Sequence, residues 1–575
     1  MNLIVKLSLP IVLMLVLQAC NDNPQLQTKS GDQQALDLAA TIYTNGDIVT
    51  MDAQRPSAQA VAIRDGKIIA VGDRNEVQAL TGNNAQLIDL DGGTLLPGFI
   101  DAHGHITYTA LNLAAANVSS PPVGTANTVA DVVELLKVHA ANTESESWVI
   151  GWGYDDSLLA EKRHPTRADL DQVSTTRPVA IRHVSGHFVS CNTPCLAVAG
   201  VNAQTLDPAG GIIRRLEGGK EPDGVLEESA MALLMSVFPK PSKQQRLKLI
   251  QAAQTYYASF GITTVQDGAV QADEIELLRE AAQSQLLQLD IVAYPYAPYL
   301  GERLSEFPSS NDYDNHFRVG GIKLVLDGSP QGKTAWLTQP YLHPPHGQKE
   351  GYTGYATLKD EQVQSFVDRA FESSTQVLAH ANGDAAADQL IKVITAANAE
   401  QGNADRRTVM IHAQTVREDQ IDSMLAQGIN PSYFSAHTFY WGDWHRDSVF
   451  GVERASRISP LRSSADKGLR YTTHNDTPIV PPDMMRLLWA SVNRVTRSGE
   501  VLGEAQRATV GEALKSITID AAYQYFEEDR KGSITVGKMA DFVVLDKNPL
   551  KVAPDAIKDI VVLQTIKDGV AVFVK

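Results

Sequence analysis

Apolar positions along this chain come in short runs that end in polar or turn-forming residues. Eight runs have the length of buried strands, and the later ones alternate with helical patterns such as residues 360–373. The runs lie at 97–105, 262–267, 289–295, 319–327, 375–380, 407–412, 429–437 and 469–476. Strands that alternate with helices form parallel sheets covered by helices. The pattern therefore predicts an α/β fold, a (β/α)8 TIM-like barrel over residues 97–529.

The segment between the first two predicted strands is far longer than a connection needs. Residues 107–245 stand where one helix and short loops would suffice, and they contain strand-like runs of their own at 148–154 and 178–184. Because this segment follows the end of a strand, we expect an inserted lid subdomain that shapes a substrate pocket. Trp152, Tyr154 and His187 are candidate pocket residues, and packing inside the insertion is the alternative for them.

Potential metal ligands occur at the ends of the predicted strands. His103 and His105 close the first run, and two imidazoles on one face of a strand end make half a zinc site. Four further candidates occupy similar positions in later runs: Lys323, His380, His412 and Asp476. In (β/α)8 barrels the reactive groups gather at this rim. Ordinary structural histidines are the alternative for a lone His-x-His pair, but the full constellation favours a metal site.

These motifs give the chain a resemblance to a known family. It resembles the amidohydrolase superfamily of metal-dependent hydrolases, and within it the branch (amidohydrolase 3) that contains N-substituted formamide deformylases. The resemblance runs from about residue 40 to the C-terminus and rests on residues 97–105, 327–329, 334–336, His380, 412–414 and Asp476. It implies that the strand-like ends of the chain, 41–96 and 530–575, combine into one small β-sandwich beside the barrel.

The resemblance also implies a role for each candidate ligand. His103 and His105 would bind one divalent metal ion, and His380 and His412 would bind a second. Lys323, once N6-carboxylated, would bridge the two ions. Asp476 would bind the first ion and act as the proton shuttle.

The chemistry of metal-assisted hydrolysis explains why these residue types are wanted. A metal lowers the pKa of its bound water from ~15.7 to roughly 7. Lys323 has no lone pair as an ammonium, so its role depends on the carbamate; pairing with Asp327 or another acid is the alternative. An acid before Thr-Pro also suits a helix N-cap, which is the alternative for Asp476. The number of ions, one or two, stays open. Zinc is the expected metal, although manganese, iron and cobalt tolerate the same ligands.

We expect a hydrolase that cleaves a non-peptide amide-type C–N bond of a small molecule by a metal-activated hydroxide, with Asp476 as proton shuttle. His437 and Trp441, after the seventh run, are expected to contact the substrate. Ala-Asn-Gly-Asp follows His380, so the His-x-x-Glu pattern of related deaminases is missing. Two alternatives stay open: a non-catalytic periplasmic binding or regulatory lipoprotein on the same barrel, or the same site hydrolysing esters, lactones or peptides.

The N-terminus predicts export. Residues 1–19 read as a signal peptide, with an apolar run that is too short to be a stable membrane anchor. The run ends in Leu-Gln-Ala-Cys20, which resembles a bacterial lipobox and implies lipidation of Cys20. Residues 20–40 would form a flexible tether. We expect a lipid-anchored protein that faces the periplasm from the outer membrane, and a soluble exported protein is the alternative.

Composition adds two limits. The 575 residues carry a formal net charge of −17, which argues against nucleic acid as a partner because such binding calls for a basic face. Cys191 and Cys195 lie four residues apart. An oxidising periplasm permits a disulfide, but the spacing does not establish one, and we expect two free buried thiols.

Overall fold

The computed structural model describes residues 40–81, 84–144, 147–186, 188–208, 211–345 and 348–575. The predicted signal peptide, Cys20, the tether up to residue 39 and His187 lie outside the described residues. No helix among the described residues is long and apolar enough to span a membrane.

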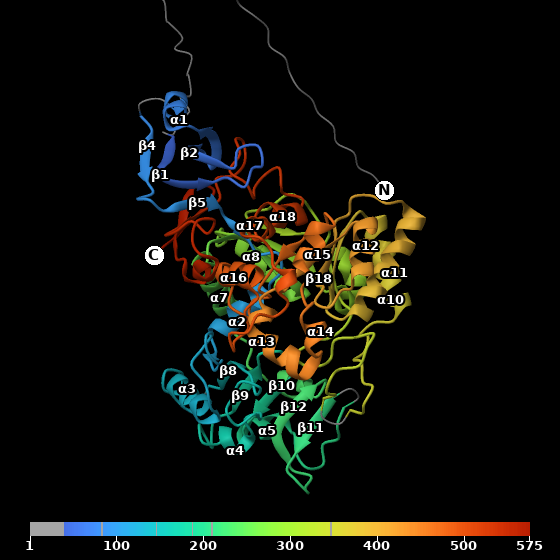
Figure 1. Cartoon of the computed structure of the whole chain (residues 1–575). Helices are drawn as coiled ribbons and strands as arrows, with labels where there is room; N and C mark the ends of the chain where they lie inside the picture. Colours follow the sequence, from blue (N-terminus) through green and yellow to red (C-terminus); the bar gives the residue numbers. More distant parts are fainter. Residues whose placement is uncertain (1–39, 82–83, 145–146, 187, 209–210, 346–347) are drawn as a thin grey trace, which may run out of the picture. The chain divides into compact units, whose positions relative to one another are not determined.

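The two ends of the chain share one sheet of eight strands (Figure 1). Its order is β23-β22-β21-β5-β1-β2-β3, and β4 pairs with β1. The strands are β1 (Thr41–Val49), β2 (Ser57–Arg64), β3 (Lys67–Gly72), β4 (Gln86–Asp89), β5 (Thr94–Pro97), β21 (Phe542–Leu545), β22 (Val562–Lys567) and β23 (Val570–Val574). A hairpin at Asp65-Gly66 joins β2 to β3, and Tyr43, Leu95 and Phe542 pack in one apolar cluster. The sandwich form of this unit stays a prediction.

Parallel strands that alternate with helices make up the centre of the chain. One sheet has the order β15-β14-β13-β6 and a second has the order β16-β17-β18-β19-β20. They consist of β6 (Phe99–Ile100), β13 (Ile262–Val270), β14 (Asp290–Pro295), β15 (Phe317–Val319), β16 (Gly321–Val325), β17 (Gln376–Ala381), β18 (Thr408–His412), β19 (Ile429–Tyr433) and β20 (Thr472–Thr473). A parallel bridge between Tyr296 and Lys323 links the two sheets. The mixed α/β fold is confirmed, and closure into an eight-stranded barrel stays a prediction.

Helices follow most of these strands and cover them with apolar side chains. They are α2 (Ile106–Leu113), α7 (Lys243–Ala258), α8 (Ala272–Gln283), α10 (Asp360–Glu372), α11 (Asp384–Gln401), α12 (Glu418–Gln427), α13 (His437–Trp444), α15 (Leu461–Asp466), α16 (Met484–Asn493), α17 (Val510–Ser516) and α18 (Ile519–Gln524). In α10, Val363, Val367 and Ala370 recur at helical spacing and are buried, whereas its first turn carries Asp360 and Glu361. The central core is therefore formed between the sheets and these helices.

Several predicted strands end earlier than their apolar runs suggest. The first covers only Phe99–Ile100, so the expectation that His103 and His105 alternate along a strand is wrong. After Ile100 the backbone of Asp101 still donates to Thr264, but that of His105 donates to Thr477, and α2 begins at Ile106. The run at 319–327 is split at residue 320, that at 429–437 ends at residue 433, and that at 469–476 keeps two strand residues.

The insertion forms a sheet of its own with the order β11-β12-β10-β9-β8-β7 (Figure 1). Its elements are β7 (Ala116–Asn117), α3 (Val129–Ala141), β8 (Val149–Tyr154), α4 (Arg167–Leu170), β9 (Val179–His183), β10 (Phe188–Cys191), α5 (Thr193–Ala199), β11 (Gly211–Arg215), β12 (Pro222–Glu228) and α6 (Met231–Met235). Val132 and Leu136 of α3 pack on Val149 and Ile181 of the sheet. These residues therefore form an inserted subdomain with its own core; its role as a lid stays a prediction.

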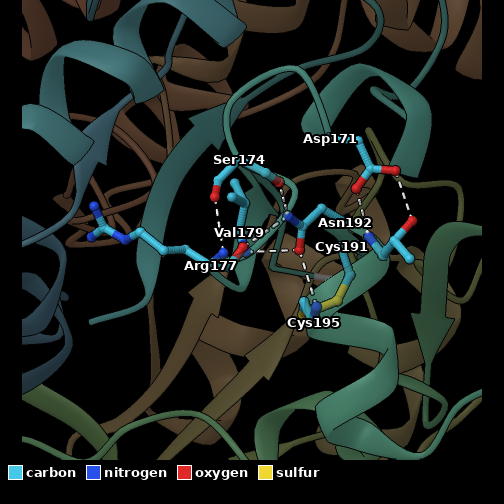
Figure 2. The surroundings of a disulfide bond; sticks show 8 residues. Asp171, Ser174, Arg177, Val179, Cys191, Asn192 and Cys195 are labelled. Carbon is cyan, nitrogen blue, oxygen red and sulfur yellow. Dashed lines mark hydrogen bonds between the residues drawn. A yellow bond between two sulfur atoms is a disulfide. The ribbon is translucent and has the colours of Figure 1, made fainter. Parts of the chain in front are cut away.

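Cys191 and Cys195 form a disulfide, so the expectation of two free thiols is wrong (Figure 2). Cys191 ends β10 and Cys195 lies in the first turn of α5, which brings their Cα atoms to 5.7 Å, within the range that a disulfide spans. Asn192 between them caps the helix. Its side-chain oxygen accepts from the backbone N–H groups of Cys195 and Val179, at 3.0 and 2.8 Å. The bond therefore fixes the junction of a strand and a helix.

Candidate functional site

Three of the predicted ligands converge just beyond the ends of β6 and β20. Nε2 of His105 lies 3.1 Å from Oδ1 of Asp476, and Nε2 of His103 lies 3.3 Å from the same oxygen. His103 and Asp476 are buried, and His105 is partly exposed. Their ligand atoms all lie within 4.8 Å of one another, as a single metal ion requires.

The other nitrogen of each imidazole is held by the neighbouring strand β13. Nδ1 of His103 lies 2.5 Å from Oε1 of Gln266, and Nδ1 of His105 lies 2.7 Å from the carbonyl oxygen of Gly268. Acceptors at Nδ1 keep the ring proton there and leave the lone pair of Nε2 free for a cation. A Cβ on Gly268 would lie 2.8 Å from Cε1 of His103, so only glycine leaves room for this ring.

Gln266 is itself held by a residue near the end of the chain. Its amide nitrogen donates to the hydroxyl oxygen of Tyr525 at 2.8 Å and to the carbonyl of Ala102 at 2.9 Å. The Tyr525 hydroxyl donates in turn to the carbonyl of Asp101 at 2.7 Å. These bonds fix the amide orientation, and hence the orientation of the His103 ring.

Lys323 lies beside this group and is almost completely buried. Its Nζ is 3.3 Å from Nε2 of His103. Burial lowers the pKa of Lys323 to about 7, an effect that Asp476 partly opposes. Asp327 accepts instead from the backbone N–H groups of Trp336, Asn382 and Gly383, and no ion pair of Lys323 with an acid occurs among the described residues. The alternative of a Lys323–Asp327 pair is therefore not seen.

His380 and His412 lie at the ends of the neighbouring parallel strands β17 and β18, as predicted. Nε2 of His412 is 3.1 Å from Nδ1 of His380 and 4.0 Å from Oδ2 of Asp476. Nε2 of His380 faces the carbonyl of Gly328 at 3.1 Å. The two rings thus adjoin the group of His103, His105 and Asp476 through the second oxygen of the aspartate.

His474 belongs to the same cluster, although the sequence did not single it out. Its Nε2 lies 3.1 Å from Nδ1 of His412, and its Nδ1 lies 2.9 Å from the hydroxyl of Ser432. The available signal was its place two residues before Asp476, at the end of an apolar run. We call the following residues the main cluster: His103, His105, Lys323, His380, His412, His474 and Asp476.

Burial controls the charge of the main cluster. It lowers the pKa of His103 and His412 well below the usual value, aided by neighbouring cationic groups, and lowers that of His474 to about 3. For Asp476, burial raises the pKa, but the hydrogen bond and the charge of His105 outweigh it and lower the pKa. At neutral pH His103, His412 and His474 are therefore uncharged imidazoles and Asp476 is a carboxylate, which are the donors that a divalent cation prefers.

Asp476 is presented by a tight turn and not by a helix end. Its φ of +55° lies in the left-handed region, which aspartate tolerates better than most residues. The backbone N–H of Ile479 donates to its carbonyl at 2.8 Å. The next helix, α16, has Asp483 as its N-cap. The helix-cap alternative for Asp476 is therefore not seen.

A cavity of about 180 Å³ opens beside the turn of Asp476, between the inserted subdomain and α13. Trp152 and Trp441, both predicted to contact the substrate, line it, together with Asp155, Tyr440, Thr477 and Arg497, which the sequence did not single out. His437 does not line this cavity. It is buried, with its ring 4.5 Å from that of Trp441 and its Nδ1 2.9 Å from Nε2 of His445.

Comparisons with known proteins agree with this geometry. A family model described as "Amidohydrolase family" matches residues 86–573. The N-substituted formamide deformylase of Arthrobacter pascens is 28% identical over 92% of this chain and 97% of its own length. The putative amidohydrolase YtcJ of Bacillus subtilis is 25% identical over 93% and 99%.

A solved structure shows the same fold. The structure of an uncharacterized metal-dependent hydrolase from Pyrococcus horikoshii superposes with a TM-score of 0.72 at 22% identity and covers 90% of this chain and 99% of its own. At this identity the likeness establishes the fold alone, a mixed α/β fold of the TIM-barrel type.

Proposed function

From the premise that the chain belongs to the amidohydrolase family, we propose that it cleaves an amide-type bond of a small molecule at the main cluster. The chain is a metal-dependent hydrolase that acts on C–N bonds other than peptide bonds. One observation carries the proposal. Nε2 of His103 and Nε2 of His105 both face Oδ1 of Asp476, at 3.3 and 3.1 Å. Two imidazoles and one carboxylate leave a coordination position open, as in catalytic metal sites.

The residues of the cluster fit a divalent cation. The Nδ1 atoms of His103 and His105 face acceptors, so Nε2 is the free donor on each ring. When bound, such an ion lowers the pKa of its water to near neutral pH, and the ion itself polarises the scissile carbonyl. Zinc is the proposed metal because it favours nitrogen and carboxylate ligands.

Asp476 would carry the proton during the reaction. Its Oδ1 faces the two histidines, whereas Oδ2 lies 4.0 Å from Nε2 of His412. Because His105 lowers its pKa, the carboxylate is ionised before attack and can accept the proton of the attacking water. It would then donate that proton to the leaving nitrogen, which departs as a neutral amine.

A second ion is proposed next to the first. His380 and His412 would hold it, and Lys323 as its carbamate would bridge the pair. A pKa of about 7 supports this role, because only the neutral amine reacts with carbon dioxide. With Lys323 unmodified, the site would hold one ion.

The cavity beside Asp476 supports a substrate with an apolar substituent on nitrogen. The side chains of Trp152, Trp441 and Tyr440 form apolar walls, and Thr477 places the cavity next to the proposed proton carrier. The relative from Arthrobacter pascens is named for N-substituted formamides. We therefore propose N-substituted formamides and related small amides as the first substrates to test. In this proposal the strands of the two central sheets close into the barrel, and the inserted subdomain is its lid.

Metal analysis and matched substrates test the proposal. The main cluster of the purified full-length chain is expected to hold one or two zinc-like ions, and His103→Ala is expected to lose metal and activity together. Unchanged metal content in that variant would contradict the assignment of the site. Amide and ester pairs of the same shape then separate amide from ester hydrolysis, and no turnover of either by the metal-loaded chain would favour the binding or regulatory alternative.

We also propose that the chain is exported and anchored through a lipid on Cys20, facing the periplasm. The support is the sequence Leu-Gln-Ala-Cys20 after a short apolar run. Palmitate labelling in a bacterial host tests it: labelled wild type and unlabelled Cys20→Ser are expected. Labelling of both would contradict the anchor site.

A further inference from the structure

We propose a second, separate metal site in the inserted subdomain, formed by Asp155, Asp156 and His183 with His164 beside them. We call these four residues the inserted cluster. Asp155 and Asp156 directly follow β8, and His183 is the last residue of the parallel neighbour β9. The proposal does not depend on the proposed function, because none of the four belongs to the main cluster.

The donor atoms of the inserted cluster converge on one point. Nε2 of His183 lies 3.1 Å from Oδ1 of Asp156 and 3.9 Å from Oδ1 of Asp155. Ligand atoms of these three residues lie within 4.8 Å of one another. Nε2 of His164 lies 3.8 Å from Oδ2 of Asp156 and could supply a fourth ligand. Imidazole and carboxylate donors in this number suit zinc or a similar divalent transition-metal ion.

The ring of His183 indicates that something is missing from this group. The residue is 6% exposed, yet its Nε2 has no hydrogen-bond partner among the described residues. Oδ1 of Asp156 lies nearer to this nitrogen than Oδ1 of Asp155 does, at 3.1 Å. An unsatisfied buried nitrogen is destabilising, and an ion at the meeting point of the donors would give it a partner.

Other contacts hold the ligands in position. Nδ1 of His183 lies 2.8 Å from Oγ of Ser185 and 3.1 Å from its backbone nitrogen. The backbone N–H of Ser185 donates to this nitrogen. A cation at Nε2 would place the ring proton on Nδ1, where the Ser185 hydroxyl can accept it in place of that bond. Nδ1 of His164 lies 3.0 Å from the hydroxyl of Tyr154. Both rings thus have the outer partners that metal-bound histidines need.

The site is accessible, and nearby cationic side chains have other partners. A cavity of about 610 Å³ is lined by Asp155, Asp156, His164 and His183. Of the cations on its wall, Arg214 pairs with Glu227, Lys162 donates to the carbonyl of Ser157, and Lys333 donates to the hydroxyl of Ser448. Among the described residues, none of the three forms an ion pair with Asp155 or Asp156.

The site would connect the inserted subdomain to the wall of the substrate cavity. Oδ2 of Asp155 accepts from Nε1 of Trp441 at 3.3 Å, and both residues line the cavity beside Asp476. An ion on Asp155 would hold that carboxylate, and through it Trp441, in one position. We therefore assign the ion a positioning role and not a catalytic one.

Zinc titration of the metal-free full-length chain, read with a chelating dye, tests the site. Asp156→Asn and His183→Gln are each expected to bind one equivalent fewer than the wild type. Asp171→Asn is the matched control, because Asp171 lies in the same subdomain and contacts Thr193 instead. It is expected to keep the wild-type number. Equal stoichiometry in all four proteins would overturn the proposal.

A second background separates the two clusters and guards against misfolding. In a chain with His103, His105, His380 and His412 each replaced by Ala, which removes the histidine ligands of both ions proposed for the main cluster, zinc is still expected to bind one equivalent and to raise the unfolding temperature. Adding Asp156→Asn should abolish that rise while leaving the metal-free unfolding temperature unchanged. Anomalous scattering from a zinc-soaked crystal should show a peak among Asp155, Asp156 and His183. A peak at the main cluster alone would overturn the proposal.

Discussion

The main cluster and the inserted cluster have the same backbone plan but different donors. In the main cluster, His380 and His412 stand at the ends of the parallel neighbours β17 and β18. In the inserted cluster, Asp156 and His183 stand at or just after the ends of the parallel neighbours β8 and β9. Parallel strands bring their carboxyl ends to one edge, so each pair places its side chains together. The local geometry alone does not distinguish a reactive site from a positioning site.

The surroundings make the difference. The main cluster contains five histidines, one lysine and one carboxylate, which is shared by two rings. The inserted cluster has two carboxylates and faces a larger cavity. In Asp476, Oδ1 faces His103 and His105, and Oδ2 lies 4.0 Å from Nε2 of His412. In Asp155, both oxygens accept hydrogen bonds, from Ser157 and Trp441. Only the first arrangement leaves an acid free to exchange a proton.

The largest effect is expected for Asp476→Asn. An amide cannot accept the proton of the attacking water, so kcat should fall by about 1,000-fold, within the range for loss of an acid–base group. The same change at Asp155 should cost less than about tenfold, because that residue only positions Trp441. Steady-state kinetics on one amide substrate measures both, and equal losses would remove the distinction between the clusters.

Loss of Lys323 is expected to have the next largest effect. Lys323→Ala should lose one metal ion and on the order of 100-fold in kcat, the upper end of what supporting residues around a metal contribute. A short carboxylate such as propionate should restore part of both, since it replaces the anionic oxygens of a carbamate. Metal analysis and steady-state kinetics of Lys323→Ala, with and without added propionate, measure the loss and its rescue. Full metal content without rescue would contradict the bridging role.

A pH effect on reconstitution should be smaller. Burial lowers the pKa of Lys323 from 10.5 to about 7, so the amine is mostly protonated at pH 6 and mostly neutral at pH 8. Only the neutral form reacts with carbon dioxide, so activation of the metal-free chain by zinc and bicarbonate should be about tenfold faster at pH 8. Activation rates that are equal at the two pH values, or independent of bicarbonate, would contradict the carbamate.

The smallest effect is expected for Trp441→Phe. This change keeps the aromatic wall and removes the N–H that donates to Asp155. One hydrogen bond contributes about 1 kcal/mol, so KM should rise about fivefold with kcat unchanged. Tyr440→Phe, in the same wall, is the control for a general effect on packing. A larger fall in kcat would show that the connection between the two clusters reaches the reaction itself.

The sequence predicted the parts of this molecule that depend on local pattern. His380 and His412 could be located because an apolar run followed by histidine marks a strand end, and parallel strands bring such ends together. His474 was missed because the strand before it is only two residues long, so the sequence pattern did not mark His474 as a strand-end residue. Asp155 and Asp156 were missed because nothing local shows that β8 lies beside β9. The disulfide was missed because spacing does not reveal a strand-to-helix junction.

The link from Tyr525 through Gln266 to His103 determines when the centre can form. Residue 103 is synthesised long before residue 525. The His103 ring therefore emerges from the ribosome before the Tyr525 hydroxyl, which fixes the Gln266 amide that orients the ring. The orientation of the His103 ring is therefore expected to be unfixed during most of translation. Metal capture would then be one of the last events in the maturation of the chain, after its final helices have docked.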